Sequence, residues 1–235
     1  MCNPACLQFG REHLTQDDAL NKKVIEVGSR DVNGSFRAGL ERFGPGSYLG
    51  VDLAMGPGVD EICPITELVS RYGPESFDVV ISTEVLEHVR DWRGAISNLK
   101  RILRPNGVLL VTTRSKGFPY HGYPYDFWRY EVEDIHTIFS DLTIDVVQKD
   151  PVSPGVFVRA HKPASFAERN LDAISLYSIV TQKHCRDVTS LQINVRRLRH
   201  EVRRLLSHFL SKQVLANFDR VVTREQAADY GLGGR

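Results

Sequence analysis

Short apolar runs alternate with segments of helical periodicity through the first two thirds of the 235-residue chain. Runs such as residues 77–82 are typical of buried strands, whereas residues 36–43 and 92–103 carry apolar side chains at helical spacing. We expect strands at 24–27, 48–52, 59–62, 77–82, 108–112, 142–147 and 156–160. Because strands joined through helices form right-handed crossovers, this alternation predicts a parallel sheet that is covered on both faces.

The last two expected strands are joined by residues 151–155, a Pro- and Gly-containing turn that is too short for a crossover helix. We therefore expect the sheet to finish with an antiparallel pair. After Pro163 the alternation stops and only helical patterning remains. We place a domain boundary here, and expect a sheet domain over 1–164 and a helical extension over 165–235.

The expected extension contains an apolar seam whose members are spaced alternately three and four residues apart. They are Val188, Leu191, Val195, Leu198, Val202, Leu205 and Phe209. Burying such a seam requires the sheet domain, a second copy of the chain or another protein, so residues 188–209 are a candidate surface for a homodimer or a partner. Off the seam lies a basic face made by Arg196, Arg197, Arg199, Arg203 and Arg204. A basic face can contact RNA or anionic lipid, although solvation is its commoner explanation.

The formal net charge of +1 hides an uneven distribution, because residues 1–164 hold 18 basic and 22 acidic residues and residues 165–235 hold 12 and 7. A mildly acidic sheet domain gives no support for a nucleic-acid groove. No apolar run approaches the roughly 20 residues that cross a bilayer, and the first residues lack the pattern of a secretory signal. With four scattered cysteines, this composition predicts a cytoplasmic protein with free thiols.

The turn after the first expected strand is a candidate nucleoside site. Gly28 lies at the carboxyl end of that strand, and Asp52 ends the second strand. In an open parallel sheet, ligands bind beyond the carboxyl ends of the strands, and an acidic side chain there accepts the hydrogen bonds of a ribose diol. Arg30 occupies the place of the second glycine in the dinucleotide fingerprint, which favours a ligand with a ribose but without a phosphate.

Four motifs follow one another in the expected sheet domain. They are Val-Ile-Glu-Val-Gly-Ser at 24–29, Gly-Val-Asp-Leu at 50–53, a strand that runs into Glu-x-x-Glu-His-Val at 77–89, and Leu-Lys-Arg-Ile-Leu-Arg-Pro-Asn-Gly-Val-Leu at 99–109. Over residues 20–162 they resemble the class I S-adenosylmethionine (SAM)-dependent methyltransferases. The resemblance implies SAM as cofactor and a Rossmann-like α/β fold, with a seven-stranded, mostly parallel sheet and an antiparallel final hairpin.

By this resemblance, the cofactor-binding positions are Glu26, Gly28, Ser29, Arg30, Asp52, Leu53, Ile65 and Thr83. Asp52 would hold the ribose, Leu53 would border the adenine, and Thr83 would lie near the sulfonium. Arg30 replaces a glycine that is usual in the family, and can instead pair with the cofactor carboxylate. Pro64 stands where many relatives have an aspartate that contacts the adenine amino group.

Glu84, Glu87 and His88 have the spacing that places side chains on one side of a helix. Histidine is the side chain whose ordinary pKa suits proton transfer near neutral pH, so His88 is our first candidate for a general base. The alternatives are a helix-dipole role for the two carboxylates and a simple hydrogen bond between His88 and a backbone carbonyl. The Glu-x-x-Glu-His arrangement resembles two metal-assisted branches of the class, the ubiquinone-pathway catechol O-methyltransferases and the small-RNA 3′-terminal 2′-O-methyltransferases. Together with these three residues, His121 would complete a divalent-metal site, as a later histidine does in the RNA branch.

Residues 116–130 form the most unusual segment, a loop with seven aromatic side chains after the fifth expected strand. Loops at this edge of a sheet shape the acceptor pocket of α/β enzymes. His121 is therefore a second candidate catalytic residue, and Asp126 and Arg129 can bond hydroxyl groups, whereas Trp128 is expected in the core. Similar Pro-x-Asp-x-Trp-Arg loops occur in methyltransferases of glycan and secondary-metabolite synthesis.

These features favour SAM-dependent O-methylation of a small hydroxylated acceptor, such as a glycan precursor or a secondary metabolite. Two alternatives stay open. The departures at Arg30 and Pro64 allow a non-catalytic SAM-binding subunit that recruits an enzyme through its C-terminal helix. The basic extension allows an RNA 2′-O-methyltransferase, although the charge of the sheet domain makes nucleic acid an unexpected partner.

Overall fold

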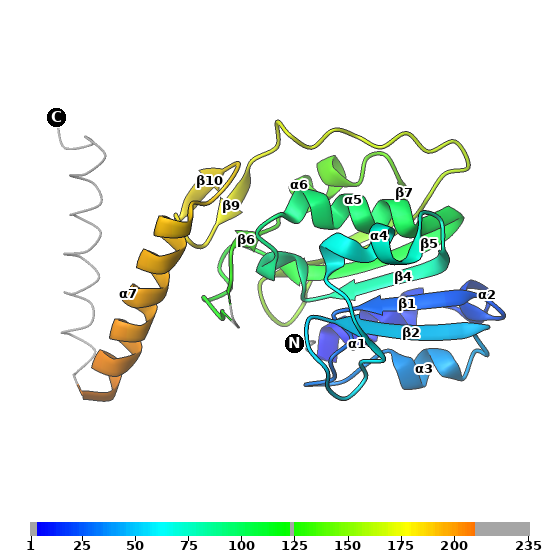
Figure 1. Cartoon of the computed structure of the whole chain (residues 1–235), viewed down its shortest axis with the longest axis horizontal. Helices are drawn as coiled ribbons and strands as arrows, with labels where there is room; N and C mark the ends of the chain where they lie inside the picture. Colours follow the sequence, from blue (N-terminus) through cyan, green and yellow to red (C-terminus); the bar gives the residue numbers. More distant parts are fainter. Residues whose placement is uncertain (1–3, 123–124, 210–235) are drawn as a thin grey trace. The chain divides into compact units, whose positions relative to one another are not determined.

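The computed structural model describes residues 4–122 and 125–209 (Figure 1). Contacts divide the chain into two compact units, Met1–Val188 and Thr189–Arg235. The division falls later along the chain than residue 164, because residues 165–188 pack with the sheet domain rather than with the C-terminal helix.

The first unit contains a seven-stranded sheet with the strand order β3-β2-β1-β4-β5-β8-β7. The strands are β1 (Lys23–Val27), β2 (Ser47–Asp52), β3 (Glu61–Ile62), β4 (Phe77–Thr83), β5 (Leu103–Arg114), β7 (Thr143–Lys149) and β8 (Gly155–His161). Strands β1 to β5 pair in parallel, whereas β8 is antiparallel to both β5 and β7. The mostly parallel sheet with an antiparallel final hairpin is therefore confirmed.

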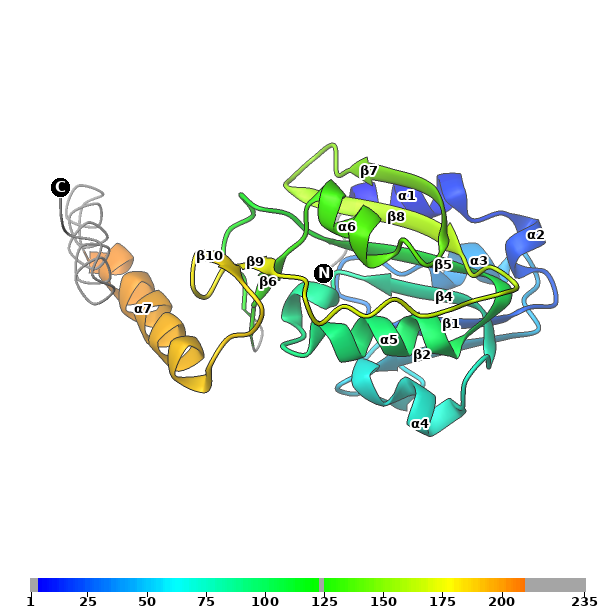
Figure 2. The ribbon, with the colours of Figure 1, turned by 90° about the horizontal axis from the view of Figure 1, so that it is seen from above.

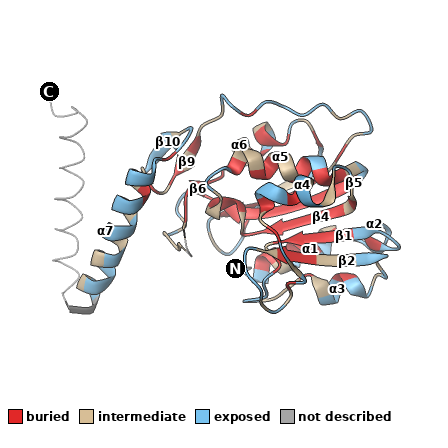
Figure 3. Cartoon of the chain, viewed as in Figure 1, coloured by how far each residue is buried: buried red, intermediate tan, exposed pale blue. Residues whose placement is uncertain are grey.

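Helices cover both faces of this sheet (Figure 2). On one face, α1 (Pro4–His13), α2 (Gln16–Ala19) and α3 (Arg37–Glu41) share a buried cluster with alternate residues of the central strands. The other helices are α4 (Leu68–Tyr72), α5 (Trp92–Ile102) and α6 (Val132–Ile138), with 3₁₀ turns at Ile65–Glu67 (η1) and Leu86–His88 (η2). Because both faces are covered, consecutive residues of β4 are buried (Figure 3).

Helix α5 illustrates how the local sequence dictates an element. Asp91 caps it by accepting a hydrogen bond from Gly94 N at 3.0 Å. Its apolar positions repeat at helical spacing and are buried, with Trp92, Ile96 and Leu99 at 0% exposure. The chain then leaves the helix directly into β5. The helix predicted over 92–103 therefore matches α5 closely.

The segment after β8 differs from the prediction, which gave it only helical patterning. It holds the short strands β9 (Leu176–Ser178) and β10 (Lys183–Cys185), which form a three-stranded antiparallel sheet with β6 (Trp128–Arg129). The expectation was wrong because these strands are two or three residues long. Such runs are too short to show a period, and β6 and β9 find each other only in the folded chain.

The second unit contains α7 (Ser190–Phe209), the helix predicted in the extension. It begins with a reciprocal cap, in which Gln192 N donates to Thr189 Oγ1 and Thr189 N donates to Gln192 Oε1. Its seam is exposed, with fractions of 73%, 66% and 59% for Leu191, Leu198 and Leu205. Within residues 4–122 and 125–209, no helix has the length and apolar character needed to cross a bilayer.

Candidate functional site

A tight turn follows β1 and is hydrogen-bonded to the carboxyl end of β2. Gly28 has a φ of +79°, and a Cβ there would lie 2.1 Å from a methyl carbon of Val85, so only glycine fits this backbone. The amides of Gly28 and Ser29 both donate to Val51 O, at 2.8 and 3.0 Å. The turn that follows the first strand is thus held against the second strand and against the segment that follows β4.

Asp52 lies at the same edge and has a fixed carboxylate. Its Oδ2 accepts from Arg30 N at 3.2 Å, and its Oδ1 accepts from Leu53 N at 2.6 Å. The large apolar side chains of Leu53 and Met55 lie at this edge and are 66% and 57% exposed. The edge therefore offers an oriented carboxylate beside an exposed apolar surface, which suits the ribose and the flat base of a nucleoside.

The other predicted cofactor residues lie around this edge in different ways. Glu26 is buried and accepts from Tyr48 Oη at 2.6 Å, and its burial raises the pKa of its carboxyl. Ser29 is also buried, with its hydroxyl directed at Gly50 rather than toward the edge. Ile65, in η1, and Thr83, at the end of β4, are buried as well. Arg30 is exposed and Asp52 is half-buried, so backbone groups and these two side chains are the accessible chemistry of this turn.

Beside this turn, three side chains converge from two parts of the chain. Glu87 and His88 come from η2, and His121 comes from the aromatic loop after β5. Glu87 Oε1 lies 3.9 Å from His88 Nε2 and 3.8 Å from His121 Nε2. One potential ligand atom from each residue lies within 4.8 Å of the others. A carboxylate and two imidazoles therefore meet at one point.

A second contact orients each of these groups. Thr113 Oγ1 donates to Glu87 Oε2 at 2.9 Å, which leaves Oε1 facing the two rings. His88 Nδ1 lies 2.5 Å from Tyr125 O, so Nδ1–H donates to this carbonyl, and in the neutral ring the lone pair is then on Nε2. The expected alternative for His88, a hydrogen bond to a backbone carbonyl, thus exists and itself directs Nε2 toward Glu87. His121 Nδ1 lies 3.0 Å from Asp126 Oδ2. Imidazoles held by a carbonyl or a carboxylate in this way are typical of metal ligands.

The pKa values of His121 and Glu87 in this cluster are both strongly shifted. Burial opposes a charged His121, but the facing carboxylates of Asp126 and Glu87 outweigh it and raise the pKa of the ring to about 9. Burial alone would raise the pKa of Glu87; the neighbouring imidazoles instead lower it to about 2. The carboxylate is therefore ionised and His121 is protonated near pH 7 when no cation replaces the proton.

Asp126 and Arg129 do not face an acceptor as predicted. Both are buried, and two guanidinium nitrogens of Arg129 donate to the two carboxylate oxygens of Asp126 at 2.6 and 2.7 Å. This bidentate pair fixes the carboxylate that orients His121. Sequence reasoning assigned these residues to hydroxyl binding because an arginine and an aspartate three positions apart carry no sign of burial.

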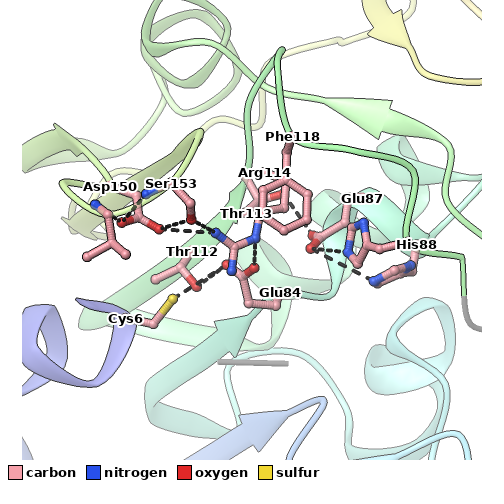
Figure 4. Close-up of polar contacts among 12 residues, drawn as sticks. Cys6, Glu84, Glu87, His88, Thr112, Thr113, Arg114, Phe118, Asp150 and Ser153 are labelled. Carbon is pink, nitrogen blue, oxygen red and sulfur yellow. Dashed lines mark hydrogen bonds and ion pairs between the residues drawn. The ribbon is translucent and has the colours of Figure 1, made fainter. Parts of the chain in front are cut away.

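Glu84 lies apart from the three converging residues, contrary to the helical spacing on which its selection rested. It precedes η2 with a φ of +57°, so the chain does not form the expected helix there. Its carboxylate pairs with Arg114 and accepts from Thr112 Oγ1 at 3.0 Å and from the Cys6 thiol at 3.6 Å (Figure 4). Burial raises the pKa of Glu84 well above its ordinary value.

Arg114 extends this second network across the sheet. It also donates to Asp150 Oδ2 at 3.0 Å and to Ser153 Oγ at 2.9 Å, and it lies 4.3 Å from the centre of the Phe118 ring (Figure 4). The network ties β5 to the turn between β7 and β8 and to the start of the aromatic loop. Sequence reasoning missed it, because its members are scattered over the whole sheet domain.

A family model described as a methyltransferase domain matches residues 7–146. The chain belongs to the class I SAM-dependent methyltransferases. It is 32% identical over 68 residues to a ubiquinone biosynthesis O-methyltransferase of Parvibaculum lavamentivorans, and 30% identical over 127 residues to one of Idiomarina loihiensis. These stretches are 29% and 48% of this chain, and 26% and 50% of those relatives. The chain thus spans at most about half the length of either relative.

The fold of this methyltransferase-family chain is also found among solved structures. One is the 1,6-didemethyltoxoflavin-N1-methyltransferase of Burkholderia thailandensis, with bound 1,6-didemethyltoxoflavin and S-adenosylhomocysteine. It is 16% identical, has a TM-score of 0.55, and the match covers 68% of this chain and 80% of that one. At this identity the likeness establishes the fold alone.

Proposed function

We propose that the protein transfers the methyl group of SAM to a hydroxyl oxygen of a small acceptor at the Glu87–His88–His121 cluster. The observation that carries the proposal is the convergence of these three oriented side chains at the edge where class I methyltransferases bind their cofactor. Val85, which contacts the turn at Gly28, lies two residues before Glu87 and joins the two places. The printed names of the curated relatives, O-methyltransferases at low identity, support the same reaction type.

In this proposal the edge at β1 and β2 binds the cofactor. Asp52 accepts hydrogen bonds from the ribose hydroxyls, and the exposed Leu53 and Met55 cover the adenine. The turn at Gly28 lets backbone approach the methionine part closely, and Arg30 lies beside it to pair with the cofactor carboxylate. The acceptor oxygen would attack the methyl carbon in line with the carbon–sulfur bond, which breaks to release S-adenosylhomocysteine and leaves a methyl ether on the acceptor.

The acceptor hydroxyl must lose its proton, and the cluster provides for this. In its neutral form the His88 ring donates through Nδ1 to Tyr125 O and presents a lone pair on Nε2, which is placed to accept the proton. The ring of Phe118 borders the cluster, with its centre 4.8 Å from that of the His121 ring. Such a surface packs against a sugar or an aromatic ring, which supports a small hydroxylated acceptor such as a glycan precursor.

As an alternative to the base role of His88, the three side chains fit a divalent cation, with His88 Nε2 as a ligand. Glu87 Oε1 is buried and has no hydrogen-bond donor among the described residues, and it faces the Nε2 atoms of both rings. Imidazole and carboxylate ligands suit several first-row divalent metals. A bound cation would supply Lewis-acid chemistry, lowering the pKa of the acceptor hydroxyl. Glu84 pairs with Arg114 instead and would not be a ligand of the cation.

Calorimetry with SAM and label transfer test this function together. The wild type is expected to bind SAM, and Asp52→Ala to bind it at least tenfold more weakly because the ribose loses its acceptor. Incubation with methyl-labelled SAM and fractionated cell extract should place the label in small metabolites. Label in RNA would overturn the acceptor class, and absence of SAM binding by the wild type would overturn the function. Retention of full activity by His88→Ala would remove the proposed base.

We also propose that α7 pairs with α7 of a second copy. Its seam places Val195 and Val202 alternately with Leu191, Leu198 and Leu205, and valine at one seam position with leucine at the other favours parallel two-stranded coiled coils. The exposure of these leucines supports a surface that associates. Sedimentation equilibrium should show a dimer that Leu198→Glu abolishes and Ser207→Glu, on the opposite side of the helix, retains. A monomeric wild type would overturn this proposal.

A further inference from the structure

The segment between the sheet and α7 packs onto the loop that carries His121, although it lies beyond the residues that match the family model. We call residues 171–187 the strap. Strand β9 of the strap pairs antiparallel with β6, so Ser178 lies opposite Trp128 and Tyr177 opposite Arg129. Strand β6 therefore has its only strand partner in the described chain within the strap.

Phe127 joins the strap to the cluster through its backbone. Its amide donates to Glu87 O at 2.8 Å. Its carbonyl accepts from Ile179 N at 3.0 Å and from Ser178 Oγ at 3.0 Å. Phe127 is thus held between a residue of the cluster on one side and the strap on the other. Asp126, which orients His121, is the residue immediately before it.

Arg93 fastens the strap to α5. Its Nε donates to Leu171 O at 3.0 Å, its Nη1 to Arg186 O at 2.9 Å and its Nη2 to Ile174 O at 2.5 Å. One guanidinium therefore binds both ends of the strap to the sheet domain. Its own place is fixed because it lies 4.4 Å from the ring centre of Trp92, which is fully buried.

We propose that the strap is a positioning element of the candidate site, with Arg93 and Ser178 as its positioning residues. Arg93 holds both ends of the strap, Ser178 fixes the Phe127 carbonyl, and Phe127 sets the backbone on which Asp126 and Arg129 are mounted. This pair in turn aims His121 Nε2 at Glu87. The inference rests on the proposed function, because it concerns the geometry of the same three converging side chains.

Arg93→Ala in the full-length protein tests this inference with two readouts. The first is calorimetric affinity for Co²⁺ beside affinity for SAM, and the second is hydrogen exchange of residues 118–122 and 125–130. We expect Co²⁺ to bind about tenfold or more weakly, as for outer partners of metal ligands, and exchange of the loop to rise at least tenfold. SAM affinity should stay within about twofold, since β1 and β2 do not contact the strap in the described hydrogen bonds and strand pairs.

Matched variants separate positioning from general stability. Arg104→Ala removes an arginine that pairs with Asp78 and bonds Glu75 O at the other end of the strands, and should change neither readout. Ser178→Ala removes the hydrogen bond to Phe127 O and a second one, from Val180 N within the strap. It should shift both readouts in the direction of Arg93→Ala, and it tests the inference if the arginine variant does not fold. Unchanged loop exchange and Co²⁺ affinity in a folded Arg93 variant would overturn the inference. A wild type that binds no Co²⁺ would overturn the metal proposal alone. Hydrogen exchange of the loop in the Arg93 and Ser178 variants would then still test whether the strap positions it.

Discussion

The charge on His121 makes the stability of the metal-free protein depend on pH in a defined window. Between the facing carboxylates of Asp126 and Glu87, the pKa of the ring rises from 6.5 to about 9. A group whose pKa is raised by folding stabilises the folded state fully below its unfolded pKa. That stabilisation is lost as the pH rises through the folded pKa. The window therefore runs from about pH 6.5 to pH 9.

The magnitude follows from the same two values. Because a tenfold change in proton affinity corresponds to about 1.4 kcal/mol, the rise to about 9 contributes about 3 kcal/mol below pH 6.5. The perturbation is His121→Asn, which removes the titrating ring and leaves Asp126 paired with Arg129. The wild type should exceed the variant in free energy of unfolding by about 3 kcal/mol more at pH 6 than at pH 9.5.

Urea unfolding followed by circular dichroism, with EDTA in every sample, measures this difference. Groups that titrate equally in both proteins cancel when the two free energies are subtracted. A difference that stays constant from pH 6 to 9.5 would refute the reasoning, because it would mean that His121 holds no additional proton in the folded state. A difference that grows with pH would reverse the sign and refute it as well.

Three further substitutions give separate outcomes. Gly28→Ala should lower the free energy of unfolding, measured by thermal denaturation, by at least about 1 kcal/mol because of the positive φ alone. It should also abolish SAM binding in calorimetry, because the added carbon displaces the turn. Asp126→Asn should cost about 3 kcal/mol in urea unfolding, since it leaves the buried guanidinium of Arg129 without its carboxylate; an effect under about 1 kcal/mol would contradict the pairing. Thr113→Val should weaken Co²⁺ binding about tenfold at unchanged SAM affinity, because Glu87 loses the donor that orients it.

The parts of the fold that sequence predicted are those with a local period. Residues 79–81 of β4 and the apolar positions of α5 show their burial in the sequence, because a doubly covered strand and an amphipathic helix have distinct patterns. The antiparallel end of the sheet followed from one short turn at 151–155. Each of these signals lies within a single stretch of chain, so no long-range pairing had to be known.

The candidate site was predictable only in its residue types. A helix was assumed after β4, and spacing then placed Glu84 beside Glu87; the positive φ at Glu84 instead directs the two carboxylates into different networks. The strap escaped prediction because β6 and β9 lie almost fifty positions apart and pair over only two residues. Strand pairs of this kind form only once the sheet is complete, so local sequence propensity does not predict them.

The anchoring of the strap also has a mechanical consequence. Arg186 O is fastened by Arg93, Val188 is fully buried, and α7 begins at Ser190. The chain therefore passes a fixed point immediately before the helix starts. A load that any binding partner places on α7 is borne by the guanidinium on α5 before it reaches β9. Along the chain, the contact between Arg93 and Arg186 therefore lies between α7 and the strap residues that hold the Phe127 carbonyl.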